Sequence, residues 1–62
     1  MKKYIFTIRY FDKRYNHFFD VEISTMANSY PTAFYRAVAV GIDETTASKN
    51  LQLMSITFKT WG

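Results

Sequence analysis

Two stretches in which apolar and polar residues alternate constrain the fold of this chain more than any other feature. The first covers residues 2–11, the second covers residues 17–25, and only a short polar segment separates them. Alternation with a period of two places successive side chains on opposite faces of a β-strand, and the aromatic and β-branched residues in both stretches favour strands. Two strands joined by a short polar turn form a β-hairpin.

The register of this hairpin follows from its apolar faces, which must lie on the same side of the sheet, because a shift by one residue turns one of them over. In the register that we favour, Arg9 lies opposite Asp20 and two phenylalanines face each other near the turn. A competing register has a two-residue turn made of Lys13 and Arg14, which lack the conformational freedom of the Gly or Asn usual there. Cross-strand ion pairs and aromatic pairs stabilise the first register, which we therefore predict.

A helix is predicted to begin near Pro31, because proline fits the first helical turn. Apolar residues then recur at spacings of three and four, which indicates a helix with one buried stripe. The stripe consists of Phe34, Ala37, Val38, Gly41 and Ile42. Either Gly41 ends this helix, or it is a close-packing point in a helix that reaches about Ala47.

Residues 51–60 form a third predicted strand, in which the alternation is less regular. On the predicted apolar face lie Gln52, Met54, Ile56 and Phe58. On the opposite face lie Leu53, Ser55, Thr57, Lys59 and Trp61. Leu51, Leu53 and Met54 do not share a face, which indicates a β-bulge or a lip over the core near Leu53.

The order strand, strand, helix, strand predicts an α+β fold. A right-handed crossover places the third strand beside the first, which gives a two-layer ββαβ unit: a three-stranded antiparallel sheet of order 2-1-3 with one helix packed on one face. A chain of 62 residues has room for one such domain, residues 1–62. A core this small, with no cysteine for disulfides, is marginally stable, so we expect a partner or a second copy to associate with it.

Charge and composition limit the classes of partner and compartment. The net charge of +3 is a mild basic excess, which permits binding to nucleic acid without requiring it. The absence of cysteine fits a reducing compartment, and we expect a complete soluble protein in the cytoplasm. No window approaches the roughly 18 uncharged apolar residues that a membrane span needs, so no insertion into a membrane is expected.

The side chains that catalysis needs are scarce. His17 is the only histidine, and its place at the start of the second strand indicates a surface residue. Asp20 and Glu22 share a strand face, where cross-strand pairing explains them, and the adjacent Asp43 and Glu44 point to different sides of a helix, unlike metal ligands. No phosphate-binding loop or hydrolase motif occurs. We therefore expect no enzyme, with no catalytic residue, metal, cofactor or small-molecule substrate.

One helix covers only one face of a three-stranded sheet, which leaves the other face for water, a second copy or a ligand. The predicted open face carries more large apolar side chains than an idle surface does. We therefore predict that this face, or an exposed strand edge, binds another protein or a second copy of the chain. The predicted contacts are the apolar Ile5, Phe11, Phe18, Leu53 and Trp61, and the basic Lys3, Arg9 and Lys59.

The alternative prediction is a nucleic-acid platform, because open sheets with aromatic and basic side chains stack bases and neutralise phosphates. Its residues are Lys3, Lys59 and Trp61, with Lys13 and Arg14 at the far end of the hairpin. In size and layout alone, the chain resembles small phage and mobile-element proteins, some of which inhibit host enzymes or immune complexes by occlusion. This likeness implies a phage-type inhibitor as one form of the protein-binding function, and it carries over no residue.

Overall fold

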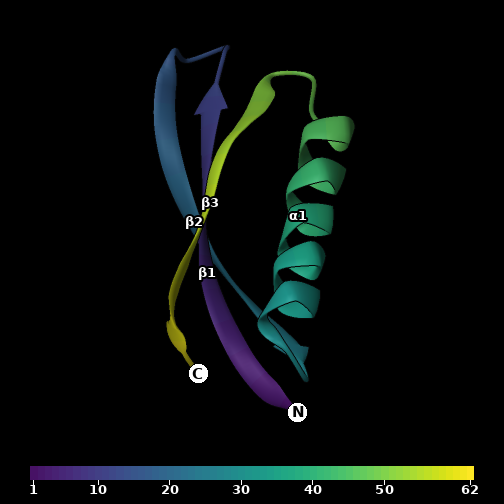
Figure 1. Cartoon of the computed structure of the whole chain (residues 1–62). Coiled ribbons are helices and arrows are strands. Elements are labelled where there is room, and N and C mark those ends of the chain that lie inside the picture. The colour runs from purple at the N-terminus through teal and green to yellow at the C-terminus, as the bar shows by residue number, and fades with distance from the viewer.

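Three 11-residue strands and one helix make up the fold, which a computed structural model describes for residues 1–62. β1 spans Lys2–Asp12, β2 spans His17–Ala27, α1 spans Tyr30–Ala47 and β3 spans Leu51–Trp61. The strands form an antiparallel sheet of order β2-β1-β3, and α1 lies along one face of it (Figure 1). The predicted α+β class, the ββαβ order and the sheet order are confirmed, and each strand is one or two residues longer than predicted.

The molecule is elongated and thin. It measures 38 × 19 × 12 Å. Because a strand advances about 3.3 Å per residue, each 11-residue strand extends along nearly the whole length of the molecule. The helix α1 has no stretch long and apolar enough to cross a membrane.

The hairpin of β1 and β2 has the predicted register, with no shift along its length. Arg9 lies opposite Asp20, as expected. The turn contains four residues, and the Asp12 carboxylate accepts hydrogen bonds from the backbone N–H groups of Arg14 (2.9 Å) and Tyr15 (3.4 Å). Asn16 has a φ of 55°, a left-handed conformation that asparagine tolerates better than most residues. The turn chemistry therefore excludes the tighter two-residue alternative.

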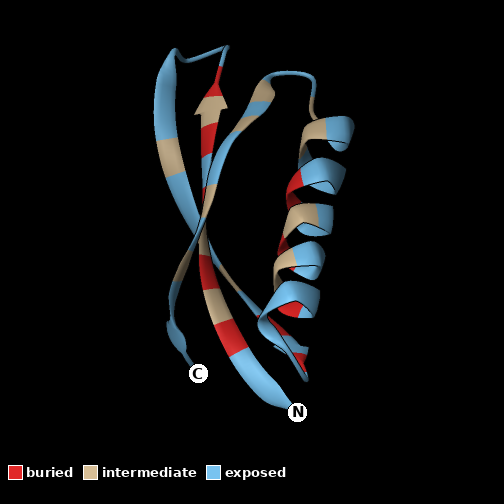
Figure 2. Cartoon of the chain, viewed as in Figure 1, coloured by how far each residue is buried: buried red, intermediate tan, exposed pale blue.

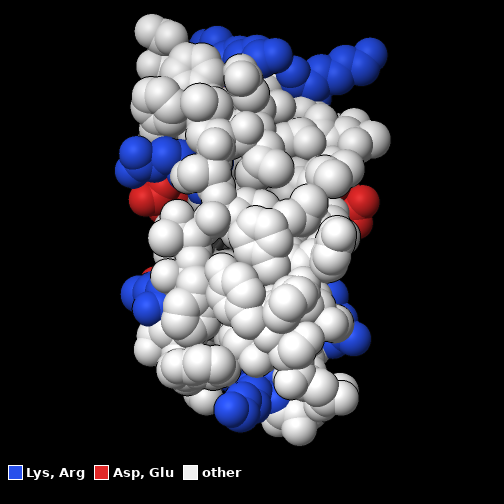
Figure 3. All heavy atoms as spheres, viewed as in Figure 1, with Lys and Arg blue, Asp and Glu red and all other residues white.

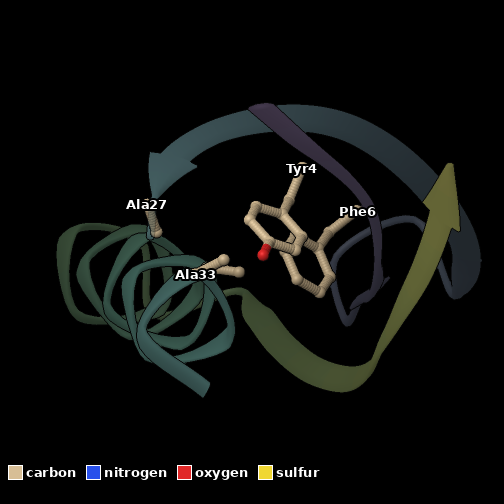
Figure 4. Close-up of a cluster of buried hydrophobic side chains, with 5 residues drawn as sticks. Tyr4, Phe6, Ala27 and Ala33 are labelled. Carbon is tan, nitrogen blue, oxygen red and sulfur yellow. The ribbon is translucent and has the colours of Figure 1, made fainter. Parts of the chain in front are cut away.

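The core lies between α1 and the central strand β1. Five residues of β1 are buried at alternate positions, as Figure 2 shows in red: the apolar Tyr4, Phe6, Ile8 and Tyr10, and Asp12 at the end of the strand. The fully buried residues of the helix are all small, Ala33, Ala37 and Gly41, and the partly buried Phe34 packs beside them against the core. Figure 4 shows the rings of Tyr4 and Phe6 directed toward Ala33. Only 10 of the 62 residues are buried, so this core is small even for a short chain.

Gly41 is a close-packing point within α1, and the helix continues past it to Ala47. A Cβ atom at this position would lie 3.2 Å from both terminal methyl carbons of Leu53. The predicted buried stripe was correct for Ala37 and Gly41 and wrong for Ile42, which is 52% exposed. The helix packs on a row of small residues four apart, because these allow its backbone to approach the sheet closely.

The pairing of β3 with β1 contains two register shifts. Met54 and Lys59 are the extra residues, and neither has a partner on β1. Each extra residue reverses the alternation of faces along β3. As a result, apolar residues of different parity all reach the helix side: Leu51, Leu53, Ile56, Phe58 and Trp61. The bulge predicted near Leu53 is confirmed, and the one at Lys59 is an addition.

The face assignments that ignored these bulges were wrong. Leu53 and Trp61, which were predicted on the open face, lie opposite buried tyrosines of β1 on the helix side. Gln52, which was predicted to face the core, lies opposite Phe11 on the open face, and Met54 is 45% exposed. The physical reason is burial, because the two bulges bring every large apolar side chain of β3 except Met54 toward the helix.

Candidate protein-binding surface

Two ion pairs occupy the middle of the sheet face that points away from α1, called the open face below. Arg9 Nε donates to Asp20 Oδ1 at 2.9 Å, and Lys59 Nζ donates to Glu22 Oε2. The hydrogen bond from Arg9 lowers the pKa of the Asp20 carboxyl, and the same bond raises the pKa of Arg9. The Lys59 side chain spans from β3 to β2 across Thr7. These four charges neutralise one another within the chain.

An aromatic pair lies at the hairpin end of the open face. The rings of Phe11 and Phe18 are 4.9 Å apart, and the guanidinium carbon of Arg9 lies 5.8 Å from the Phe18 ring centre. The Phe18 side chain is 53% exposed. Three predicted contact residues therefore meet here, whereas Ile5 and Lys3 lie toward the other end of β1.

The basic and aromatic residues predicted to bind nucleic acid do not share one face. Lys59 is paired with Glu22, and Trp61 lies on the helix side, where Lys2 Nζ is 5.2 Å from its ring centre. The Lys3 side chain lies against the backbone of Gly62. The other two predicted residues, Lys13 and Arg14, are in the hairpin loop.

Six aromatic rings meet where the start of α1 faces the end of β3, and we call this group the aromatic corner. Its members are Tyr4, Phe6, Tyr30, Phe34, Phe58 and Trp61. Each ring contacts at least two others, with centroids 4.7 to 6.2 Å apart. The inner two are buried, but Trp61 is 55% exposed and Tyr30 is 44% exposed. The corner therefore presents aromatic rings to the outside that are packed against other rings of the chain.

A shallow depression of about 390 Å³ continues the aromatic corner along α1. It is lined by Tyr30, Pro31, Phe34, Tyr35 and Val38, none of which is charged. Figure 3 shows that Lys, Arg, Asp and Glu are confined to the margins of this side of the molecule. The depression and the aromatic corner together therefore form one uncharged and partly exposed patch.

A smaller groove of about 230 Å³ lies between α1 and β2. Phe19, Val21 and Val40 line it, together with the ring of Tyr10 and the Glu44 carboxylate. Burial raises the pKa of the Tyr10 hydroxyl, and the negative charge of Glu44 raises it further. This groove is smaller in volume than the depression beside the aromatic corner.

His17 is exposed at the start of β2, between the rings of Tyr15 and Phe19. No three histidine, aspartate or glutamate side chains come together in the structure. The buried Asp12 carboxylate is used by the hairpin turn.

Sequence reasoning did not find the aromatic corner, because it assigned Phe34 and Phe58 to the core and Trp61 to the open face. A signal for it does exist in the sequence. The apolar residues of β3 change from odd to even numbers and back again: Leu51 and Leu53, then Ile56 and Phe58, then Trp61. Two bulges are the simplest way to place such a series on one face.

Comparisons of the chain with models of known protein families, with curated proteins and with solved structures found no match. The geometry and chemistry of the surface are therefore the basis for assigning a function.

Proposed function

We propose that this protein is a non-catalytic interaction module that acts by occupying a surface of another protein. The proposed contact surface is the aromatic corner with its adjoining depression. The observation that carries the proposal is the exposure of large apolar side chains together on this surface, among them Trp61 and Tyr30. Inhibition by occlusion is the mode of action that we propose for such a module.

Aromatic residues are the commonest anchors of protein interfaces, because they bury a large area while few torsions become ordered. Trp61 is already held by its neighbours, with ring centres 4.7 Å from Tyr4 and 5.4 Å from Phe58. A side chain that is ordered before binding loses little conformational entropy when the partner arrives. This supports Trp61 as the central anchor of the interface.

Two lysines stand beside this anchor. Lys2 and Lys3 line a hollow of about 540 Å³ together with Trp61. Neither forms an ion pair within the chain. We infer that the partner presents an apolar segment with acidic residues next to it, because these would face the two ammonium groups.

The proposal places the main contact on the helix side, whereas the sequence predicted the open face. The ion pairs of the open face already satisfy their charges, and exposed pairs of this kind contribute little to an interface. Phe11 and Phe18 remain the open-face residues that a partner could use, and they therefore provide a direct comparison.

The test compares two aromatic residues of nearly equal exposure on opposite sides of the sheet. The wild-type protein, Trp61→Ala and Phe18→Ala are immobilised and used to capture proteins from the native host. A partner protein is expected to be lost with Trp61→Ala and retained with Phe18→Ala, while circular dichroism shows both variants folded. Loss with Phe18→Ala alone would move the site to the open face, and equal capture by all three would refute the proposed surface.

A nuclease arm separates protein from nucleic acid in the same experiment. The proposed partner survives nuclease treatment. If the captured material instead disappears with nuclease, and is released between about 50 and about 200 mM salt, the alternative prediction of a nucleic-acid platform is favoured, since phosphate contacts make affinity depend on salt.

A further inference from the structure

The outer surface of α1 carries a second row of residues, on the side that faces away from the sheet. Its members are exposed and uncharged, and they follow the spacing 3-4-3-4: Thr32, Tyr35, Ala39, Ile42 and Thr46. Residues with this spacing lie on one side of a helix, and the same pattern forms the contact line between paired helices. We call this group the outer row.

The outer row exposes apolar area that a solitary helix normally turns inward. The sheet-facing side of α1 buries only Ala33, Ala37 and Gly41. Two larger side chains point the other way, since Tyr35 is 76% exposed and Ile42 is 52% exposed. They are seven residues apart, which is two helical turns, so they lie one above the other on the same side.

Opposite charges flank the outer row on one side. Arg36 follows Tyr35 and Asp43 follows Ile42, so the two charges are also seven residues apart. Asp43 belongs to no ion pair in the chain, and Arg36 donates Nη1 to the backbone carbonyl of Met26, which leaves its other N–H groups free. Figure 3 shows basic and acidic atoms at separate positions along the α1 side, with uncharged surface between them.

We propose that two copies of this chain associate through the outer row, with their α1 helices antiparallel about a twofold axis near Ala39. The axis places Arg36 of each copy beside Asp43 of the other, so two ion pairs form. It also places Thr32 of one copy near Thr46 of the other copy, and Tyr35 of one copy against Ile42 of the other.

The charges favour the antiparallel arrangement. In an antiparallel pair, the flank that carries Arg36 and Asp43 on one helix lies beside the same flank of the second helix. Arg36 of each copy then lies next to Asp43 of the other copy, which gives two contacts. In a parallel pair, the flank with Arg36 and Asp43 on one helix would lie beside the other flank of the second helix. That other flank consists of the uncharged Pro31, Val38 and Thr45, so neither charge would gain a partner. Ala39 at the axis permits close approach, because helix axes pack about 8 Å apart where side chains are small. The surface is thus complementary to itself, as a twofold interface must be.

The interface is short, which sets its expected strength. The 18 residues of α1 give a helix about 27 Å long. One such helix pair buries less area than a standard protein interface, so we expect a reversible dimer that dissociates on dilution. The aromatic corner contributes no residue to the outer row, although the adjoining depression shares Tyr35 with it. The two surfaces are separable by mutation at Trp61 and at Ile42, each of which belongs to one surface alone.

The test is the mass of the protein in solution by sedimentation equilibrium, between about 10 and about 500 µM, a range in which a weak complex dissociates. The wild type is expected to approach the dimer mass at the upper end. Ile42→Glu is expected to remain a monomer, whereas Met54→Glu, a change of similarly exposed apolar residue on another face, is expected to behave as wild type. A wild-type monomer throughout the range would overturn the proposal, as would a dimer that Ile42→Glu leaves intact.

A charge exchange tests the antiparallel geometry itself. Asp43→Arg and Arg36→Asp are each expected to weaken the dimer about tenfold, as loss of close interfacial charge pairs does. The double variant restores both pairs with reversed signs and is expected to recover most of the wild-type affinity. Failure of the double variant to recover, with circular dichroism showing it folded, would contradict the antiparallel pairing.

Trp61→Ala separates this proposal from the proposed function. The variant is expected to keep the wild-type dimer equilibrium while losing the captured partner protein. If Trp61→Ala abolishes the dimer, the second copy occupies the aromatic corner, and the outer row is not the interface.

Discussion

The central strand β1 has two neighbours that pair with it in different ways. β2 follows it through a four-residue turn and keeps one register over its whole length, whereas β3 arrives after the helix and shifts register twice. In β2, strict alternation of the sequence places the apolar side chains on the helix side without any change of register. In β3, strict alternation would turn some of the apolar side chains away from the helix. The bulges at Met54 and Lys59 shift the register so that these side chains lie on the helix side.

The magnitudes explain this outcome. An unpaired residue in a bulge costs about the net value of a backbone hydrogen bond, roughly 1 kcal/mol. Fully burying a leucine, isoleucine or phenylalanine side chain contributes about 1.5–3 kcal/mol. Without the bulges, Leu51, Leu53 and Trp61 would lie on the face opposite to Ile56 and Phe58. The partial burial of these three side chains on the helix side offsets the cost of the two bulges, and one of them is Trp61 of the proposed binding surface.

Single-residue deletions should expose the difference between the two strands most strongly. Removing Glu22 from β2 turns Phe19 and Val21 outward and Asp20 inward, so we expect a loss of about 3 kcal/mol or more in the free energy of unfolding. Removing Met54 from β3 removes the extra residue and leaves every face in place, so we expect a change below about 1 kcal/mol.

Urea titration of both deletion variants measures this contrast. Glu22→Ala is the control, because it removes the side chain and its ion pair but keeps the register, and it should stay close to wild type. If the two deletions destabilise equally, burial does not determine the register of β3.

The contact of α1 with the bulged strand should show the next largest effect. Gly41→Val places a branched side chain where even a Cβ atom lies 3.2 Å from Leu53, so we expect a loss of about 1–3 kcal/mol. Combining it with Leu53→Ala makes room for the valine, so the two changes together should cost less than their sum. If the two losses are additive in a double-mutant cycle, the valine at position 41 does not act through its contact with Leu53.

Alkaline pH should weaken the fold through Tyr10, which lies between the two neighbours, opposite Phe19 on β2 and Leu53 on β3. Burial raises the pKa of Tyr10 above its ordinary value of 10.0. The unfolded chain therefore releases this proton first, and the free energy of unfolding falls as pH rises from about 10 through the folded pKa.

Tyr10→Phe removes this titration, so its unfolding midpoint should decline less steeply between pH 9 and 11 than that of the wild type, as followed by circular dichroism. The remaining four tyrosines are common to both proteins and cancel in the difference. Identical declines would show that the Tyr10 hydroxyl is not desolvated by the fold.

The smallest expected effect concerns the ion pair within the regular hairpin. Arg9→Met removes the hydrogen bond to Asp20, so the pKa of the Asp20 carboxyl should rise toward its ordinary value. Carbon-detected NMR titration reports this pKa directly. Because the pair is exposed, the unfolding midpoint should barely move in high salt. An unchanged Asp20 pKa would mean that the pair does not form in solution.

The hairpin could be predicted from the sequence because its determinants are close together in the chain. The alternation of residues 2–11 and 17–25 and the polar segment between them leave few registers, and the Arg9 and Asp20 pair selects one. Phe11 and Phe18 were placed correctly on the open face for the same reason. The crossover handedness, a general property of such connections, then gave β3 its place beside β1.

The candidate site was predicted only in part. The protein-binding function predicted for an apolar surface stays a prediction, but the residues expected to form that surface divide between two faces. Ile5, Phe11 and Phe18 lie on the open face, and Leu53 and Trp61 lie on the helix side. A rule of strict alternation cannot locate a bulge, since one extra residue reverses the face of every residue beyond it.

The sequence by itself determined the order of elements, the central place of β1 and the hairpin register, because these follow from short-range alternation and turn chemistry. Only the tertiary structure decided how far α1 extends, that Ile42 faces away from the sheet, and on which side Leu53 and Trp61 lie. Those features depend on how closely a helix surface of small residues can approach a particular strand. That distance arises from contacts between residues far apart in the chain, such as Gly41 and Leu53.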